Sequence, residues 1–473
     1  MAKIEKIQLV TVTANVGRGA NDGVYPPVGL LTIAKAVLQD CPHVAIQIDD
    51  QHHAPIEIDP EAQVVGIQVA STLCYKNALA VAQAAKAADK IVVLGGPHVT
   101  TLYRQVMSNR EYVDFAIRGK GERPFVQLLQ ALGTNGVSME IPALSWRRGQ
   151  EIIHNPGSIL DWDYDDYTPL PLATLSSGIA SYWEAFRITI NLEIDAAFLL
   201  FTHFGCGYRE RRTHGEQIVL GKSGQPLFCS FCSLHDPPLT RPVQSILEEL
   251  RFYLDFCQLP FGSRVHLKCY GDNIGPQIEL VRELAVAIRR CAWWCDYRFS
   301  WTFYCQSSYL NEELASLLSQ IGTTHLYIGF DGANDAVQKR NALGTSRRTH
   351  EQAVSLCLKR GIKIQAGSVV GLAGETPTTL EEMYQFLRGL AERGVLERVN
   401  SAVLFIIPGT AAYEMLCQKE PQIRPLDLLP TTELRGLWIK HFCPAVTPEL
   451  LREYAAKIDA LSPGPHAQMG YQA

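Results

Sequence analysis

Residues 196–232 read AAFLLFTHFGCGYRERRTHGEQIVLGKSGQPLFCSFC, an apolar run followed by three unevenly spaced cysteines. The run 196–206 predicts a buried strand, because short continuous apolar stretches are typical of strands that are covered on both faces. Two residues separate Cys229 from Cys232, whereas 22 residues separate Cys206 from Cys229. The function of the chain depends on whether these three thiols hold one metal centre.

Strand-like and helix-like runs alternate downstream of this stretch. Six strand–helix units predict a full or partial barrel, which carries its reacting residues at the carboxyl ends of the strands. The cysteines follow the first of these strands, so the pattern predicts that they lie on the reacting face. The later strand-like runs are 264–273, 297–306, 324–332, 363–376 and 400–410.

The first 135 residues alternate in the same way, which predicts a parallel, doubly wound sheet. Glycine and small polar residues collect after three of its strands, at 71–72, 95–98 and 119–122. In such sheets ligands bind beyond the carboxyl ends of the strands. No GxGxxG follows the first strand, so a dinucleotide is disfavoured and a larger, flat ligand fits better.

The expected organisation is an α/β chain of two domains with a connecting segment. The segments are a Rossmann-like domain over 1–135, a linker over 136–185 with a hairpin at 143–155, a barrel over 186–410, and a helical C-terminal region and tail over 411–473.

The composition is that of an ordinary globular protein, with 47% hydrophobic and 19% charged residues. The net charge of −5 gives no electrostatic footprint for nucleic acid, and no apolar run is long enough to span a membrane. The chain opens on a strand-like run rather than a signal sequence, so we expect a cytoplasmic monomer that acts on a small molecule. In that compartment the thirteen cysteines are expected to be free thiols or metal ligands.

Two kinds of metal centre fit the cysteines. Iron–sulfur clusters are held by thiolates, and three protein ligands leave one iron open to a substrate. A structural zinc site is the alternative, in which a knuckle of Cys229 and Cys232 is completed by Cys206, His203, His214 or His235. We favour the cluster, because structural zinc sites usually have two compact pairs and the chain has no second Cys-x-x-Cys.

The motifs resemble those of the cobalamin-binding radical S-adenosylmethionine (SAM) enzymes over roughly residues 5–420. The cluster loop of that family, Cys-x3-Cys-x-aromatic-Cys, is matched in its last part by Cys229, Phe231 and Cys232. The resemblance implies that Cys206, Cys229 and Cys232 hold a [4Fe-4S] cluster whose fourth iron binds SAM. It also implies that Phe231 packs near the adenine of SAM.

The resemblance extends to SAM-binding segments beyond the cysteines. Segment 270–273 takes the second-strand position that meets the methionyl amine, and Asp331 stands where the family commonly has Glu. Segments 367–376 and 405–410 match the late-strand motifs of the family. The implied SAM contacts outside the cluster loop are Gly271, Asp272, Asn273, Asp331 and Gly371.

The N-terminal half resembles the cobalamin-binding domain of the same family, in segments 25–37, 66–72, 94–100 and 114–122. The Asp-x-His-x-x-Gly motif that supplies a histidine to cobalt is absent after the first strand. Asp50-x-His52 follows the wrong strand and lacks the glycine. The resemblance therefore implies cobalamin without a protein histidine on cobalt. The implied cobalamin contacts are Ser71, Thr72, Leu73, Gly95, Gly96, His98, Gly119, Gly121 and Glu122.

The chain departs from the family at the cluster loop, where 19 extra residues stand between the first two cysteines. Segments 217–220 and 225–228 predict a hairpin joined by a turn at 221–224. The insertion either leaves the ligand geometry intact or means that another residue replaces Cys206 as a ligand. Because a hairpin returns to its starting point, we favour an intact geometry. We expect this insertion, about 209–227, to cover part of the active site. Its basic residues, which suit a carboxylate or phosphate, are Arg209, Arg211, Arg212 and Lys222.

The resemblance implies a C-methyltransferase that acts on an unactivated carbon of a small metabolite. In such enzymes the reduced cluster cleaves SAM to a radical that abstracts hydrogen, and methylcobalamin delivers the methyl group. The resemblance also implies an electron donor such as flavodoxin or ferredoxin. A cobalamin-dependent rearrangement or cyclisation without methyl transfer is the alternative, and a non-catalytic cobalamin- or metal-binding sensor is a third. No motif identifies catalytic residues or the substrate.

Overall fold

The computed structural model describes residues 4–14, 23–133, 139–157, 170–190, 193–208, 213–214, 217–233, 239–424 and 431–462. The chain folds into two compact units. The first contains the N-terminal strand and Asn21–Phe186, and the second is built mainly from Arg187–Pro421 and the C-terminal helices.

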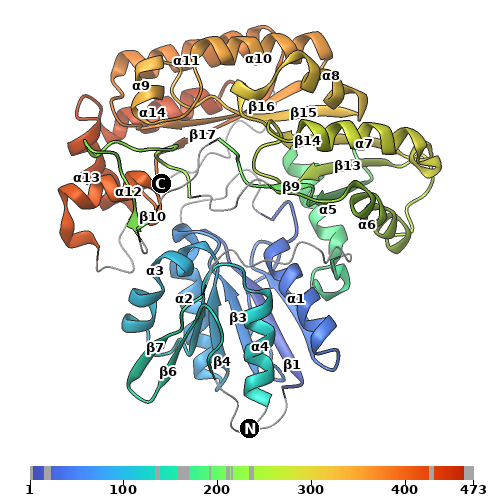
Figure 1. The fold of residues 1–473 in the computed structure, drawn as a ribbon, viewed down its shortest axis with the longest axis vertical. Coiled ribbons are helices and arrows are strands. Elements are labelled where there is room, and N and C mark those ends of the chain that lie inside the picture. The colour runs from blue at the N-terminus through green and yellow to red at the C-terminus, as the bar shows by residue number, and fades with distance from the viewer. Residues whose placement is uncertain are drawn as a thin grey trace. The chain divides into compact units, whose positions relative to one another are not determined.

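The first unit is a seven-stranded sheet in the order β2-β1-β3-β4-β5-β6-β7, with helices on both faces (Figure 1). The first five of these strands are parallel, as the alternating sequence predicts. The hairpin that was predicted within the linker becomes β6 and β7, which extend the sheet by antiparallel pairing. The strands are β1 (Lys6–Thr11), β2 (Ala45–Asp50), β3 (Val64–Gln68), β4 (Ile91–Gly95), β5 (Phe115–Ile117), β6 (Leu144–Arg148) and β7 (Glu151–His154).

Helices α2 and α3 pack on one face of this sheet, in a buried core that includes Ile67, Val92 and Leu94. Helices α1 and α4 contact each other on the other face (Figure 1). Because β3, β4 and β5 are parallel, the loops that follow them leave the sheet at one edge. The helices of this part of the chain are α1 (Val28–Asp40), α2 (Tyr75–Ala87), α3 (Pro97–Asn109), α4 (Glu122–Gly133) and α5 (Gly178–Ile190).

The second unit has six parallel strands in the order β17-β16-β15-β14-β13-β8, which confirms the predicted partial barrel. One face of the sheet is apolar, and its residues Leu267, Trp301, Phe303 and Leu326 are fully buried. The strands are β8 (Ala196–Leu200), β13 (Arg264–Cys269), β14 (Arg298–Tyr304), β15 (Thr323–Gly329), β16 (Lys363–Val370) and β17 (Leu396–Val403). The helices between them are α6 (Val243–Phe256), α7 (Ile278–Arg290), α8 (Glu312–Gln320), α9 (Asp335–Arg340), α10 (Arg347–Arg360) and α11 (Pro377–Glu392).

Three helices follow the last strand: α12 (Ala411–Lys419), α13 (Thr431–Phe442) and α14 (Pro448–Asp459). Helix α14 packs against α11 and β17, where the Asp459 carboxylate accepts a hydrogen bond from the Ser401 N–H at 2.5 Å. The 3-10 turns are η1 (Thr72–Cys74), η2 (Leu172–Thr174), η3 (Ala292–Asp296), η4 (Ser307–Tyr309) and η5 (Pro421–Ile423).

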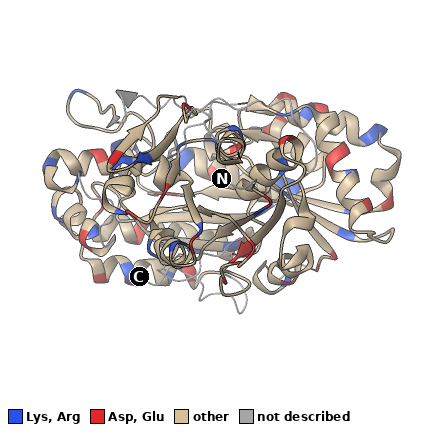
Figure 2. Ribbon diagram, turned by 90° about the horizontal axis from the view of Figure 1, so that it is seen from below, with Lys and Arg blue, Asp and Glu red and all other residues tan. Residues whose placement is uncertain are grey.

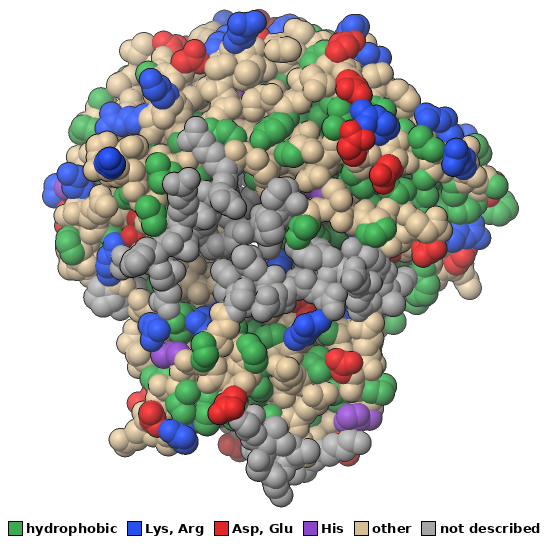
Figure 3. All heavy atoms as spheres, in the orientation of Figure 1, with side chains coloured by type: hydrophobic (Ala, Val, Ile, Leu, Met, Phe, Trp, Pro, Cys, Tyr) green, Lys and Arg blue, Asp and Glu red, His purple; other side chains and the backbone are tan. Residues whose placement is uncertain are grey.

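Basic and acidic side chains are interspersed over the faces seen in Figures 2 and 3. Exposed ion pairs such as Arg282–Glu313 and Lys359–Glu312 link neighbouring helices. Among the described residues, no helix is both long and apolar enough to cross a membrane.

Candidate cluster and cofactor sites

The loop that carries the cysteines leaves and re-enters the second unit at one place. The predicted strand 196–206 ends early, at Leu200, because the carbonyls of Phe201 and Thr202 accept hydrogen bonds from Arg241. A separate strand β9 (His203–Phe204) then pairs antiparallel with β12 (Leu239–Thr240). All three cysteines lie between β9 and β12, so the length of the loop does not force the thiols apart.

The predicted turn at 221–224 is present, because the Gly221 N–H donates to the Gln225 carbonyl at 2.8 Å, but the described arms 217–220 and 225–228 do not pair as strands. Strand β11 (Gln217–Ile218) pairs with β10 (Thr213–His214) rather than with 225–228. The apolar side chains of the two predicted arms still pack together, because Ile218 and Phe228 form a buried cluster with Ala411 of α12. This cluster anchors the insertion on α12. Lys222 is exposed, and Arg209, Arg211 and Arg212 lie outside the described residues.

The three thiols influence one another. Burial raises the pKa of the Cys229 thiol well above its usual range, and the neighbouring Cys232 and Cys206 raise it further. Such a trio is unfavourable as free thiolates, and a cationic group among them would remove the repulsion. Within the described part of the chain, no three Cys, His, Asp or Glu side chains converge on a single metal ion. Each thiolate of an iron–sulfur cluster binds a different iron, so the trio fits a cluster better than a zinc ion.

His203 is the histidine of the zinc alternative whose side chain the structure describes, and it has a packing role. Its ring pairs with the Thr202 hydroxyl at 2.9 Å and fills the space beside Gly271, where a Cβ would lie 2.4 Å from the ring. Burial lowers the pKa of His203 to about 4, so its ring is neutral at neutral pH. The side chains of His214 and His235 lie outside the described residues.

Asp272 and Asn273, on the segment after β13, contact the loop of the first cysteine. The Asp272 carboxylate accepts a hydrogen bond from the Gly205 N–H at 2.8 Å. The Asn273 amide donates to the Cys206 carbonyl at 3.0 Å and lies 3.7 Å from the Cys206 sulfur. This segment therefore orients Cys206 through the protein itself.

Asn341, which the sequence did not single out, holds the turn between Cys229 and Cys232. It is fully buried, and its amide oxygen accepts hydrogen bonds from the Ser230 hydroxyl at 2.9 Å and the Ala373 N–H at 3.2 Å. Its amide nitrogen donates to the Ala373 carbonyl at 2.9 Å. The cysteine turn is thereby tied to the loop after β16. An isolated Asn after a helix gives no signal of this role, because Asn is common at helix ends and turns.

Two carboxyls with a raised pKa, Asp331 after β15 and Glu375 after β16, lie on the same rim of the barrel. Burial raises the pKa of Asp331 to about 7 and that of Glu375 to about 8. The negative charge of Asp331 also raises the pKa of the Cys229 thiol. Glu375 accepts hydrogen bonds from the N–H groups of Gly371 and Leu372, so it fixes the turn after β16.

Gly371 is engaged on both sides within the fold. Its carbonyl accepts a hydrogen bond from the Trp438 indole at 2.8 Å, and a Cβ at this position would lie 3.2 Å from Leu451. Phe231 is half-buried between the last two cysteines. Of the predicted SAM contacts, Asp272, Asn273 and Asp331 therefore lie beside the cysteines.

The segments predicted to bind cobalamin meet at one edge of the first sheet. Ser71, Thr72 and Leu73 lie after β3, Gly95 ends β4, and Gly119 follows β5. The Gly119 N–H donates to the Thr100 hydroxyl at 2.8 Å, and that hydroxyl donates to the Gly96 carbonyl at 2.9 Å. The loops after β4 and β5 are thus joined by the Thr100 side chain. Gly121 packs against α1, where a Cβ would lie 3.2 Å from Ile33.

Two buried polar atoms at this edge, His98 Nε2 and Glu122 Oε2, have no hydrogen-bond partner within the described residues. The other ring nitrogen of His98 pairs with the Thr72 hydroxyl at 3.0 Å. Burial lowers the pKa of His98 to about 3, so the ring is neutral at neutral pH. Buried polar atoms are rarely left unpaired. The edge therefore fits a large ligand with polar side groups, such as the amides of cobalamin.

The Asp50–His52 pair, which follows β2, is used within the first unit. The Asp50 carboxylate pairs with His52 Nδ1 at 2.6 Å and accepts a hydrogen bond from the Tyr182 hydroxyl at 3.1 Å.

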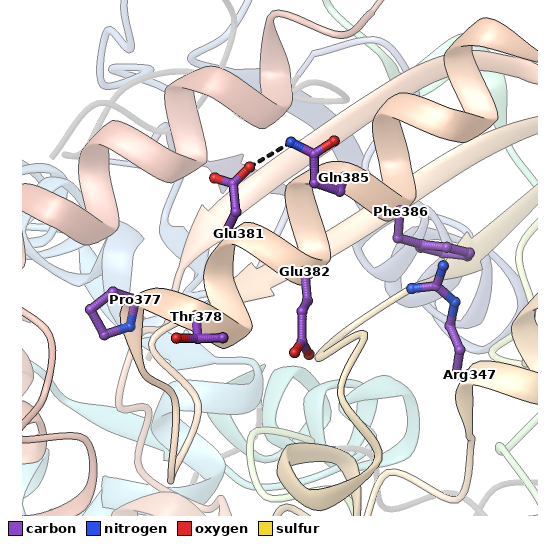
Figure 4. A pocket seen from close by; sticks show the side chains of 7 residues that line it. All are labelled: Arg347, Pro377, Thr378, Glu381, Glu382, Gln385 and Phe386. Carbon is purple, nitrogen blue, oxygen red and sulfur yellow. Dashed lines mark hydrogen bonds between the residues drawn. The ribbon is translucent and has the colours of Figure 1, made fainter.

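An open groove of about 680 Å³ lies at helices α10 and α11 (Figure 4). Its Arg347 guanidinium stands 4.2 Å from the centre of the Phe386 ring, and Gln385 donates to the Glu381 carboxylate at 2.5 Å. None of the predicted site residues lines this groove, so it is separate from the predicted cofactor sites.

Two protein families match the chain. The B12 binding domain matches residues 16–129, and the Radical SAM superfamily matches residues 226–387. The chain belongs to the cobalamin-dependent radical SAM enzymes. Its cofactors are accordingly cobalamin, SAM and a [4Fe-4S] cluster, and a radical SAM enzyme needs a reductant. The second match begins just before Cys229, so Cys206 and β8 precede it.

Relatives of this radical SAM enzyme carry two kinds of name. An uncharacterized methyltransferase of Pyrococcus horikoshii is 24% identical over 443 residues, which cover 90% of this chain and 86% of the relative. The anaerobic magnesium-protoporphyrin IX monomethyl ester cyclase of Rubrivivax gelatinosus is 25% identical over 323 residues, which cover 63% of this chain and 49% of the cyclase.

A solved structure shares the fold of this radical SAM enzyme. It is the radical SAM methyltransferase TsrM of Kitasatospora setae with tryptophan substrate and a SAM analog bound. The likeness has a TM-score of 0.64 at 16% identity and covers 87% of this chain and 76% of TsrM.

Proposed function

We propose that this enzyme methylates an unactivated carbon of a small metabolite. The proposal rests on one observation: the chain combines a cysteine trio at the carboxyl end of a partial barrel with a B12-binding sheet. A relative that matches 90% of the chain is named a methyltransferase, which supports methyl transfer as the outcome.

In this proposal Cys206, Cys229 and Cys232 hold the cluster, with Asn273 and Asn341 fixing the two parts of the loop. Asp272 and Asp331 line the adjoining SAM site, together with Phe231, Gly271 and Gly371. When bound, the reduced cluster with SAM supplies hydrogen abstraction, and cobalamin supplies the methyl group. We further propose that flavodoxin or ferredoxin provides the electron and that the enzyme works in the cytoplasm.

The edge of the first sheet holds cobalamin in this proposal, through backbone at Gly95, Gly96, Gly119 and Gly121 and through the polar atoms of His98 and Glu122. Ser71, Thr72 and Leu73 complete this set. We also propose that no histidine ligates cobalt, because the Asp-x-His-x-x-Gly motif that supplies such a histidine is absent after the first strand. Electron paramagnetic resonance of the cob(II)alamin form should lack nitrogen superhyperfine splitting from the protein.

Single Cys→Ala variants test the proposal after anaerobic reconstitution. Cys206→Ala, Cys229→Ala and Cys232→Ala should each lose the four-iron signal and the formation of 5′-deoxyadenosine from SAM. Cys295→Ala, an exposed cysteine outside the loop, is the matched control and should retain both. A Cys206→Ala protein with a full four-iron signal and SAM cleavage would show that another residue completes the site.

Cyclisation without methyl transfer is the second candidate, because two cyclases are among the relatives. Product mass separates the two outcomes. Incubation of the holoenzyme with methyl-labelled SAM and a small-metabolite extract should give a labelled product that is heavier by one methylene group. A product that forms with 5′-deoxyadenosine but carries no label would favour cyclisation.

A further inference from the structure

The polar face of the partial barrel carries the cationic side chains of Lys268 and Arg398. Register pairs place Tyr304, Tyr327, Gln365 and Arg398 in one row across β14 to β17. Lys268 of β13 pairs with Thr302 and so lies on the same face, one row lower. At the positions of β13 to β17 that share this face, all of them described, there is no Asp or Glu.

Lys268 has an aromatic partner but no ionic one. It is only 5% exposed, and its Nζ lies 3.8 Å from the centre of the Tyr304 ring and 5.9 Å from that of Tyr327. Within the described part of the chain it makes no hydrogen bond or ion pair. Burial lowers the pKa of Lys268 to about 7; the Cys269 thiol opposes this shift, and the positive charge of Arg398 adds to it.

A buried cation beside a second cation is unfavourable unless something compensates it. Lysine that is desolvated in this way and has no structural partner is typical of functional sites. Tyr304 and Tyr327 add aromatic surface and hydroxyl groups in the adjoining row. The arrangement is suited to a ligand with an anionic group and an apolar body.

We infer that Lys268 and Arg398 bind a carboxylate or phosphate of the substrate. The inference rests on the proposed function, since it names the substrate class of the same barrel. SAM also carries a carboxylate, but the position of the two cations along the barrel strands favours the substrate as their ligand. Gly329 and Gly367 form a row between Tyr327 and Asp331, and Lys268 lies on β13, three residues before Gly271 of the following segment. Both cations thus lie deeper than the predicted SAM contacts.

Benzoate and its neutral analogue benzamide test this inference by calorimetric titration of the reconstituted, SAM-saturated holoenzyme. Benzoate should bind and benzamide should not. Lys268→Met and, separately, Arg398→Gln should weaken benzoate binding by about tenfold or more, as expected for loss of a charge-assisted contact in a buried site. Lys339→Met is the matched control, because Lys339 is an exposed lysine of α9 and lies outside the sheet; this variant should bind benzoate as the wild type does.

Other outcomes overturn the inference. These are no benzoate binding to the wild type, equal binding of benzamide, or unchanged binding in both site variants. Benzoate that binds only without SAM, together with weaker SAM binding in Lys268→Met, would assign the cations to the carboxylate of SAM. Iron content and uncoupled SAM cleavage should be unchanged in Lys268→Met. A wild-type enzyme that binds no iron or does not cleave SAM would count against the proposed function, not against the anion site.

Discussion

At the residue scale, Gly96 is required by the packing of the protein itself. The sequence suggested that Gly95 and Gly96 leave bare backbone for a ligand. At Gly96, however, φ is +102° and a Cβ would lie 2.7 Å from the Val69 carbonyl oxygen. Gly96→Ala should therefore lower the free energy of unfolding by about 2 kcal/mol, from left-handed strain and the clash. Urea unfolding measures this. The control is Gly95→Ala, because a Cβ at Gly95 would lie 3.8 Å from the Ile117 carbonyl oxygen. This variant should change the free energy of unfolding little, and an equal loss of stability in both variants would refute the packing role of Gly96.

At the element scale, the turn from Cys229 to Cys232 is held by Asn341, which lies outside the turn. Asn341→Ala removes the amide that joins Ser230 to Ala373 and leaves buried groups unpaired, at a cost of about 2–4 kcal/mol in unfolding free energy. We also expect faster loss of iron to a chelator, because the turn is no longer fixed. Ser230→Ala removes one of these bonds and should have a smaller effect, about 1 kcal/mol. Wild-type iron retention in Asn341→Ala would contradict this role.

At the scale of the whole molecule, buried histidines make the protein sensitive to acid. Five have a pKa lowered by burial to about 3 or about 4: His98, His203, His266, His325 and His350. Below pH 6.5 the unfolded chain binds protons at these sites and the native chain does not, so stability falls as the pH is lowered. Three carboxyls with a raised pKa act in the opposite direction: Asp331, Glu375 and Asp459.

Because five groups outweigh three, the urea midpoint should fall between pH 6.5 and pH 5. Tryptophan fluorescence of one preparation at both pH values can follow the transition. A midpoint that stays level or rises at pH 5 would mean that the carboxyls dominate.

The sequence by itself determined the two α/β units, the six parallel strands and the cofactor set. The alternation of strands and helices is a local pattern, and the cysteine turn with its Phe231 is a short motif, so neither depends on distant contacts. Cys206 is proposed as the third thiol because it follows the first apolar strand of the barrel.

Only the tertiary structure decided how these parts are held. The pairing of β9 with β12, the hub at Asn341 and the contact of Gly96 with Val69 each join residues from distant parts of the chain. The shared face of Lys268 and Arg398 depends on the register of five strands, and a shift of one residue would turn either side chain to the other face. Such register is set by packing of the whole sheet, which no single segment encodes.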